Sequence, residues 1–207
     1  MVDDHDLVRT GISRMLADVP DLDVVGEADN GETAITLARK LQPDVVLMDV
    51  RMPGIGGLEA TRKLIQHDRN LKVIAVTVCH EEPFPTRLMQ AGASGYLTKG
   101  AGLEEMVMAI RQVSMGQRYI SPDIAQLLAL KAFGSNAETP FDQLSEREIQ
   151  IALMIVSCEK VQSISDKLCL SPKTVNTYRY RIFEKLGITS DVELTLLAVR
   201  HGMIEAR

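Results

Sequence analysis

Two patterns of apolar residues divide the chain. From residue 6 to about 115, stretches with helical spacing alternate with short apolar runs rich in valine and isoleucine. This alternation is typical of a parallel β-sheet whose strands are joined by crossover helices. After about residue 140 the short apolar runs stop and only helical spacing remains. The pattern therefore predicts an α/β domain followed by an all-α domain.

The α/β part contains four runs that predict strands and five stretches that predict helices. The predicted strands are Leu22 to Val25, Val45 to Met48, Val73 to Val78 and Tyr96 to Leu97. The predicted helices cover about residues 7–16, with Leu7, Ile12, Met15 and Leu16 as the apolar face, and then 34–41, 58–65, 86–91 and 103–113. Proline and glycine, as in Met52-Pro53-Gly54, separate these segments.

The remainder of the chain predicts helices only. One helix begins at Pro122 and runs to about residue 133, and Gly134 to Pro140 has the composition of a linker. Four more helices are predicted at about 146–157, 161–168, 172–186 and 191–201, the first with Ser145 and Glu148 as a capping box. Four helices within about 65 residues form a small bundle and not an enzyme core. The expected domains are 1–116, a linker with a helix at 117–140, and 141–207.

Polar residues stand at or near the ends of the apolar runs in the first domain. They are Asp3, Asp4, Asp49, Thr77 and Lys99. Because such ends converge on one edge of a parallel sheet, the five side chains are expected to share a pocket. At an effective dielectric near 20, two like charges about 4 Å apart repel by roughly 4 kcal/mol, so three carboxylates together require a cation. The pocket predicts Mg²⁺ binding and phosphoryl chemistry.

Each pocket residue can be given a role in that chemistry. Asp4 and Asp49 suit direct coordination of Mg²⁺, Asp3 coordination through water, and Arg51 coordination by its backbone carbonyl. A carboxylate beside the ion can attack a phosphoryl donor, while Lys99 neutralises phosphate charge and the Thr77 hydroxyl bonds a phosphoryl oxygen. Singly, each residue also fits an ordinary helix-start, loop-cap or solvated position; only the combination is specific.

Charge is unevenly distributed along the chain. Residues 1–139 carry 14 basic and 19 acidic side chains, whereas residues 140–207 carry 9 of each. Six basic residues but only two acidic ones lie between 160 and 185, which suggests a local anion-binding face. The three cysteines, Cys79, Cys158 and Cys169, lack metal or redox spacing and are expected to be reduced thiols. No apolar run is long enough for a membrane span, so a soluble cytoplasmic protein without a membrane partner is expected.

The segment from 164 to 186 predicts two helices joined by a tight turn, with Ser171 as cap and Pro172 in the first turn of the second helix. On that helix the predicted inward residues are Val175, Tyr178, Ile182 and Leu186. Asn176, Thr177 and Tyr180 point elsewhere, flanked by the basic residues Lys173, Arg179, Arg181 and Lys185. Such a helix fits a DNA major groove, although a solvated basic face is the alternative.

Residues 1–115 resemble the receiver domain of response regulators. The resemblance rests on the acidic pair Asp3 and Asp4, on Asp49 followed by Met52-Pro53-Gly54, and on Thr77, Tyr96 and Lys99. It implies a flavodoxin-like α/β fold with strand order 2-1-3-4-5, Mg²⁺ as cofactor, and phosphorylation of Asp49 by a histidine kinase. It also implies that Tyr96 is an aromatic switch residue that rotates inward as Thr77 moves toward the phosphate.

Residues 140–205 resemble a LuxR-type helix-turn-helix domain. The resemblance rests on Leu144-Ser145-Glu146-Arg147-Glu148, Ser171-Pro172-Lys173-Thr174-Val175 and Lys185-Leu186. It implies base contacts from Asn176, Thr177 and Tyr180, and phosphate contacts from Lys173, Thr174, Arg179 and Lys185. Leu194, Leu197 and Ala198 correspond to the helix through which such domains form a homodimer on DNA. Cys169 stands where the family often has glycine.

Together the two parts resemble the NarL/FixJ family. The stretches Val76-Thr77-Val78-Cys79, Pro83-Phe84-Pro85-Thr86-Arg87 and Glu148-Ile149-Gln150-Ile151-Ala152-Leu153-Met154 are most similar to its GacA/UvrY group. That group implies phosphorylation by a GacS/BarA-type hybrid histidine kinase or a phosphotransfer domain, and activation of small regulatory RNA genes from promoter DNA. The chain would not be an enzyme beyond its own phosphoryl transfer and slow dephosphorylation. A catalytic phosphatase is the second class, but Asp49-Val50-Arg51-Met52 lacks the second aspartate of its motif. A constitutive DNA-binding regulator with an impaired receiver is the third.

The strand that a receiver has before its acidic pair is almost absent from this sequence. Only Met1 and Val2 precede Asp3, whereas a receiver has about five apolar residues at this place. The loss of four or five buried aliphatic side chains, at roughly 1.5–3 kcal/mol each, amounts to about 6–15 kcal/mol. The expectation is a native start further upstream, or a truncated form with an impaired receiver.

Overall fold

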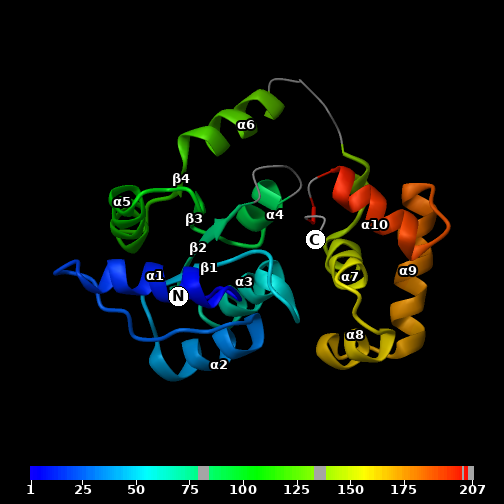
Figure 1. Cartoon of the computed structure of the whole chain (residues 1–207), viewed down its shortest axis with the longest axis horizontal. Helices are drawn as coiled ribbons and strands as arrows, with labels where there is room; N and C mark the ends of the chain where they lie inside the picture. The colour runs from blue at the N-terminus through cyan, green and yellow to red at the C-terminus, as the bar shows by residue number, and fades with distance from the viewer. Residues whose placement is uncertain (79–83, 133–138, 202, 205–207) are drawn as a thin grey trace. The chain divides into compact units, whose positions relative to one another are not determined.

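The computed structural model describes residues 1–78, 84–132, 139–201 and 203–204. They form two compact units, an α/β unit that continues through helix α6 and an all-helical unit from residue 139 onward (Figure 1). Each unit is described by itself. Residues 134–138 of the expected linker Gly134 to Pro140, and Cys79, lie outside the described residues.

The α/β unit contains a parallel sheet in the order β1-β2-β3-β4. Its strands are Val45–Met48 (β1), Lys72–Thr77 (β2), Gly95–Thr98 (β3) and Tyr119–Ile120 (β4). Strands β1, β2 and β3 confirm the strands predicted at Val45 to Met48, Val73 to Val78 and Tyr96 to Leu97. All their residues are buried except the first of β1 and β2 and the last of β3, because helices cover both faces of the sheet. The sequence did not predict β4, because two residues are too few for a periodic signal.

Residues 1–3 occupy the sheet position beside β1. The Val2 amide donates to Leu47 O at 2.9 Å and the Asp49 amide donates to Val2 O at 2.9 Å. On the other side the Met1 ammonium donates to Gly26 O at 2.9 Å, and the Ala28 amide donates to Met1 O at 3.0 Å. Residues 1–3 take the place of the first strand, residues 26–28 that of the second, and β1, β2 and β3 those of the third to fifth. The expected order 2-1-3-4-5 is therefore present.

The prediction of a strand at Leu22 to Val25 is wrong. These residues do not pair with another strand, and the described backbone pairing nearby consists of single bridges from Val2 to Ala28 and to Met48. The physical reason is the lack of a neighbour: the backbone of residues 1–3 reaches Gly26 and Ala28 but not the segment before them. A strand needs a hydrogen-bonded partner along its length.

The described part of this unit contains six helices. They are Asp6–Ala17 (α1), Gly31–Leu41 (α2), Gly56–His67 (α3), Phe84–Gln90 (α4), Leu103–Ser114 (α5) and Pro122–Ala132 (α6). Buried residues of α1 and α5, such as Ile12 and Ile110, pack with Leu47, Ile74 and Leu97 from the strands to form one core layer. Leu7 was predicted on the inward face of α1 but is 87% exposed, because the face that packs on this layer carries Val8, Ile12 and Leu16, at helical spacing of four residues.

The helical unit confirms the four predicted helices to within about a residue. A short 3₁₀ turn at Pro140–Gln143 precedes Glu146–Val156 (α7), Val161–Leu168 (α8), Pro172–Leu186 (α9) and Asp191–Arg200 (α10). The predicted capping box is present: the Glu148 amide donates to Ser145 Oγ, and the Ser145 amide donates to Glu148 Oε2 at 2.7 Å. In the described residues no helix is long and apolar enough to cross a membrane.

The loop after Asp49 returns to the sheet through a close backbone contact at Gly57. Its amide donates to Val50 O at 3.0 Å. A Cβ atom placed on Gly57 would lie only 1.9 Å from Asp49 O. Because the obstacle is backbone next to the pocket, no side-chain movement can relieve the clash. Gly57 therefore sets how closely α3 approaches Asp49.

We expect Gly57→Ala to destabilise the α/β unit by roughly 2–4 kcal/mol, because the backbone around Asp49 must move. Urea denaturation of the full chain measures the effect. Gly11→Ala is the matched control: it lies inside α1, nothing is within 4 Å of an added Cβ, and it should stabilise by about 0.5–1 kcal/mol. Equal effects of the two substitutions would contradict the close approach.

Candidate functional site

The predicted pocket residues meet at one edge of the sheet. Asp49 directly follows β1, Thr77 ends β2, and Lys99 directly follows β3, while Asp3 follows the paired segment at residues 1–2. Asp3, Asp49 and Thr77 are buried, with at most 2% of each exposed. Asp4 is partly exposed, with 23% of its side chain accessible. The convergence expected from parallel strands therefore holds for all five residues.

Lys99 joins the two buried carboxylates. Its Nζ lies 2.7 Å from Asp3 Oδ2 and 2.8 Å from Asp49 Oδ2. The backbone of the same residue is held as well, because the Lys99 amide donates to Thr77 O at 3.0 Å. The Lys99 ammonium thus lies between the carboxylates of Asp3 and Asp49 and offsets part of their negative charge.

The protonation equilibria of the pocket reflect its burial. Burial raises the pKa of Asp49 to about 6, although the hydrogen bond from Lys99 and its positive charge act in the opposite direction. Burial lowers the pKa of Lys99, but its hydrogen bonds to Asp3 and Asp49 outweigh that effect and the net pKa is raised. Lys99 therefore stays charged near neutral pH, and Asp49 is mostly ionised there but loses its charge in mild acid.

The acidic side of the pocket has the donors for a divalent cation. Ligand atoms of Asp3, Asp4, His5 and Asp49 all lie within 4.8 Å of one another. Three carboxylates form the oxygen-rich donor set that Mg²⁺ prefers, so the residues fit the ion that the resemblance implies. Sequence reasoning did not include His5, whose Nδ1 lies 3.0 Å from Asp4 Oδ1. Its position next to the acidic pair was the available signal.

The remaining predicted pocket residues are also nearby. The Arg51 amide donates to Asp49 Oδ1 at 3.3 Å, which places the Arg51 backbone in the loop beside the carboxylate. Tyr96 lies in β3, three residues before Lys99, and its side chain is fully buried. Tyr96 is therefore already buried in this structure, and its role as a switch residue stays a prediction.

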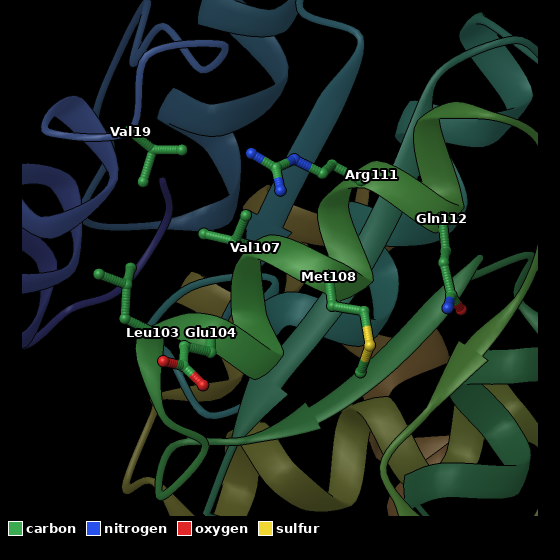
Figure 2. A pocket seen from close by; sticks show the side chains of 7 residues that line it. All are labelled: Val19, Leu103, Glu104, Val107, Met108, Arg111 and Gln112. Atoms are coloured by element: carbon green, nitrogen blue, oxygen red, sulfur yellow. The ribbon is translucent and has the colours of Figure 1, made fainter.

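A second concavity lies away from the acidic pocket, along the outer side of α5. It has a volume of about 400 Å³ and is lined by Val19, Leu103, Glu104, Val107, Met108, Arg111 and Gln112 (Figure 2). Arg111 is already paired: its Nε and Nη2 bind the Asp21 carboxylate at 2.8 and 2.6 Å. The residues that line this groove form no cluster of reactive groups.

In the helical unit, α9 presents the side chains that were predicted to read DNA. Val175 and Ile182 are buried, as the predicted inward stripe requires, whereas Tyr178 and Leu186 are only half-buried. On the outward side Lys173 and Thr177 are exposed, and Tyr180 is 69% exposed. The predicted readers Asn176, which is half-buried, and Thr177 lie in the N-terminal half of the helix, with Tyr180 further along it.

The turn before α9 is held tightly. The Thr174 amide donates to Ser171 Oγ at 3.0 Å, which confirms the predicted cap. Cys169 ends α8 with φ of 52° in the left-handed region, where a non-glycine residue is strained. Two bonds brace this turn: Arg147 Nη2 donates to Leu168 O at 3.0 Å, and Ser165 Oγ donates to Leu170 O at 2.6 Å. The departure from glycine therefore leaves the turn geometry intact.

Two of the predicted phosphate contacts are engaged inside the unit. Arg179 Nε donates to Asp191 Oδ1 at 2.7 Å, its second nitrogen binds Asp191 Oδ2, and its guanidinium lies 5.5 Å from the centre of the Phe183 ring. Lys185 Nζ lies 2.7 Å from Glu148 Oε2, and this ion pair links α9 to the capping box of α7. Sequence reasoning missed both pairings because the partners are 12 and 37 residues away.

Helix α10 presents other apolar residues than those predicted to mediate pairing. Leu194 and Ala198 are buried in the core of the unit, and Leu197 is half-buried. The large apolar residues exposed on this helix are Val192 and Leu196, at 69% and 62%. An apolar contact made by α10 with another molecule would therefore involve Val192 and Leu196 first.

Comparison with known proteins agrees with this geometry. The model of the response regulator receiver domain matches residues 1–111, and that of the luxR family of bacterial regulatory proteins matches residues 142–198. The chain belongs to the response regulators that join a receiver domain to a LuxR-type DNA-binding domain.

Its relatives include named regulators of this class. The chain is 76% identical to the response regulator GacA of Pseudomonas aeruginosa over 100% of its own length and 97% of the relative's. It is 57% identical to the response regulator UvrY of Escherichia coli over 100% and 95%. A solved LuxR-family two-component response regulator from Aurantimonas is 41% identical, with a TM-score of 0.61 over 64% of this chain and 94% of that one.

We expect Asp49→Asn to become more stable relative to the unsubstituted protein as the pH rises from 4 to 7. The folded-state pKa of Asp49 is about 6, above its ordinary value, so the folded protein binds the extra proton and loses stability as that proton leaves. The loss totals about 3 kcal/mol, which asparagine avoids. Urea denaturation of both proteins at several pH values measures it. A stability difference that does not vary with pH would contradict the raised pKa.

Proposed function

We propose that this protein is a transcription factor switched by phosphorylation of Asp49. The observation that carries the proposal is the pocket itself, in which a buried aspartate with a raised pKa is held 2.8 Å from Lys99. A buried carboxylate of this kind destabilises the fold, so its presence beside a fixed cation favours a reactive role. The exposed basic helix α9 supplies the output.

The phosphoryl step follows from the groups in the pocket. With a pKa of about 6, Asp49 is roughly 90% ionised at pH 7 and so is available as a nucleophile. One of its carboxylate oxygens forms a bond to phosphorus as the phosphorus–nitrogen bond of a donor phosphohistidine breaks. Lys99 then binds a phosphoryl oxygen in place of its contact with Asp49, and the Thr77 hydroxyl donates to another.

Mg²⁺ is the proposed cofactor. Asp4 and Asp49 would coordinate it directly, Asp3 through water, and Arg51 through its backbone carbonyl. When bound, Mg²⁺ supplies positive charge that offsets the carboxylates and orients the incoming phosphoryl group. Asp3 and Asp49 are already held by the Lys99 ion pairs, so the protein brings an ordered donor set to the ion.

The switch is proposed to work through β2 and β3, which carry Thr77 and Tyr96. A phosphoryl group adds about 1.5–2 negative charges next to Lys99, which changes the balance of its ion pairs. The populations of two receiver conformations shift only if the phosphate interacts differently with each. Thr77 and Lys99 are the groups that can make that difference, since both lie at the pocket.

For the helical unit we propose binding of promoter DNA by α9. Asn176, Thr177 and Tyr180 would contact base edges, and Lys173 and Thr174 would contact phosphates at the helix N-terminus. Arg179 and Lys185 would first stabilise the unit through Asp191 and Glu148 and reach phosphate only by exchanging partners. Homodimer formation on DNA would use α10 with Val192 and Leu196 exposed beside the predicted Leu194, Leu197 and Ala198.

The similarity to GacA and UvrY extends the proposal to partners. A GacS/BarA-type hybrid histidine kinase or a phosphotransfer domain would supply the phosphoryl group. The regulated promoters would include those of small regulatory RNA genes, with the protein as activator in the cytoplasm. The proposed domains are 1–116, 117–140 and 141–207.

The central test compares unsubstituted protein with Asp49→Ala, both treated with a small acyl phosphate and Mg²⁺. We expect acid-labile phosphate on the unsubstituted protein, stable for minutes to hours, together with tighter binding to its promoter. We expect neither for the variant, since it lacks the acceptor oxygen. Phosphate analysis and gel-shift titration are the measurements. The proposal is falsified if the two treated proteins bind the promoter with equal affinity.

A second test separates phosphate contacts from structural cations on α9. Lys173→Ala should weaken binding to specific and unspecific duplexes alike, and should lower the slope of log affinity against log salt by about 1, because one phosphate contact is lost. Fluorescence titrations at several salt concentrations measure this. Lys40→Ala, an exposed lysine of α2, is the matched control and should leave the slope unchanged. An unchanged slope for Lys173→Ala would remove this residue from the interface.

A further inference from the structure

Strand β4 pairs with β3, which carries Tyr96, and is followed in the chain by helix α6. The Tyr119 amide donates to Ser94 O at 3.1 Å, and the Ser121 amide donates to Tyr96 O at 3.0 Å. The parallel register pairs Gly95 with Tyr119 and Tyr96 with Ile120. The backbone carbonyl of Tyr96 is therefore bonded directly to the residue that precedes α6.

The other end of β3 leads to the pocket. Three residues after Tyr96, the Lys99 amide is bonded to Thr77 O, and Lys99 Nζ contacts Asp3 and Asp49. A change in the charge at Asp49 therefore acts on a residue that is continuous with β3. Because neighbouring strands are joined by short, directional hydrogen bonds, a displacement of β3 is shared with the strand paired to it.

Strand β4 is also anchored from the side by α5. The Tyr119 hydroxyl donates to Glu105 Oε1 at 3.0 Å, and the Tyr119 ring is buried. Burial, and then the hydrogen bond to Glu105, raise the pKa of Tyr119 to about 12, so the hydroxyl remains a donor at any physiological pH. β4 is therefore attached to both β3 and α5.

No flexible residue separates β4 from α6. The Ala125 amide donates to Ser121 O at 2.9 Å, so the first helical hydrogen bond starts at the residue that is bonded to Tyr96. Pro122 is the first residue of α6, and its ring restricts φ at this junction. A displacement of Ser121 must therefore reach the first turn of α6.

The junction between β4 and α6 contains a buried hydroxyl group, that of Ser121, without a hydrogen-bond partner among the described residues. Ser121 is buried, and its Oγ has no hydrogen-bond partner within the described part of the chain. Buried hydroxyls are paired in most structures, so an unpaired one calls for an explanation. A second arrangement of the junction, in which Ser121 Oγ caps the first turn of α6, would satisfy it.

We propose that Tyr119–Ser121 is a coupling strand, which transmits the state of Asp49 from β3 to the first turn of α6. Ser121 and Tyr119 act as positioning residues: the first carries the bond to the Tyr96 backbone, and the second fixes the strand to Glu105. This inference rests on the proposed phosphorylation of Asp49, and its test is chosen so that the two can fail separately.

Hydrogen exchange measured by mass spectrometry on the full chain is the experiment, with and without a small acyl phosphate and Mg²⁺. Phosphate on Asp49 is quantified in the same samples. We expect phosphorylation to change exchange in residues 119–126 by about threefold or more, as a shift of RT in local opening free energy would give. Phosphate on Asp49 with unchanged exchange there would overturn the coupling strand alone. No phosphate on Asp49 would overturn the proposed function and this inference together.

Variants distinguish coupling from simple stability. Tyr119→Phe and Glu105→Ala each remove the anchoring bond and should abolish most of the exchange response in residues 119–126 while Asp49 is phosphorylated as fast as before. Glu105→Gln keeps an acceptor oxygen and should retain the response. Tyr178→Phe, which removes a tyrosine hydroxyl from the helical unit, is the matched control and should also retain it. A full response in Tyr119→Phe and Glu105→Ala would overturn the role of the anchor.

Discussion

The ion pairs of Lys99 are the interaction on which the α/β unit depends. Asp3 and Asp49 are both buried, and Lys99 Nζ lies within 2.8 Å of an oxygen of each. Without that cation the two carboxylates would repel each other where little water screens them. Asp3 and Asp49 lie on neighbouring segments, whereas Lys99 follows β3, which β2 separates from β1. The ion pairs therefore also join segments that are not adjacent in the sheet.

Three residues of this pocket could be placed from the sequence because each stands at or near the end of an apolar run. Asp49, Thr77 and Lys99 stand where β1, β2 and β3 end, and the parallel arrangement does the rest. Two other segments of the α/β unit were not predicted correctly. Leu22 to Val25 has strand composition but no ladder partner, whereas Tyr119–Ile120 has a partner but no readable period. Pairing depends on neighbours in space, which composition does not specify.

The helical unit shows the same division. Its helix ends were predictable because caps are local: Ser145 with Glu148, and Ser171 with Thr174, lie three residues apart. The partners of its cations were not predictable. Arg179 and Lys185 read as free basic residues on the helix, yet Asp191 and Glu148 bind them from other helices. Charge in the sequence indicates an anion-binding surface only after such internal pairs are subtracted.

Two opposing effects act on the Asp49 carboxylate: its burial and its ion pair with Lys99. Burial raises the pKa of Asp49 to about 6, while Lys99 keeps the carboxylate mostly charged at neutral pH. Any group that changes the charge at Asp49 therefore changes what Lys99 binds. Lys99 directly follows β3, and β3 is bonded through Tyr96 to Ser121 at the start of α6. A continuous backbone path of β3, one hydrogen bond and Ser121 therefore joins the residue that contacts Asp49 to the start of α6.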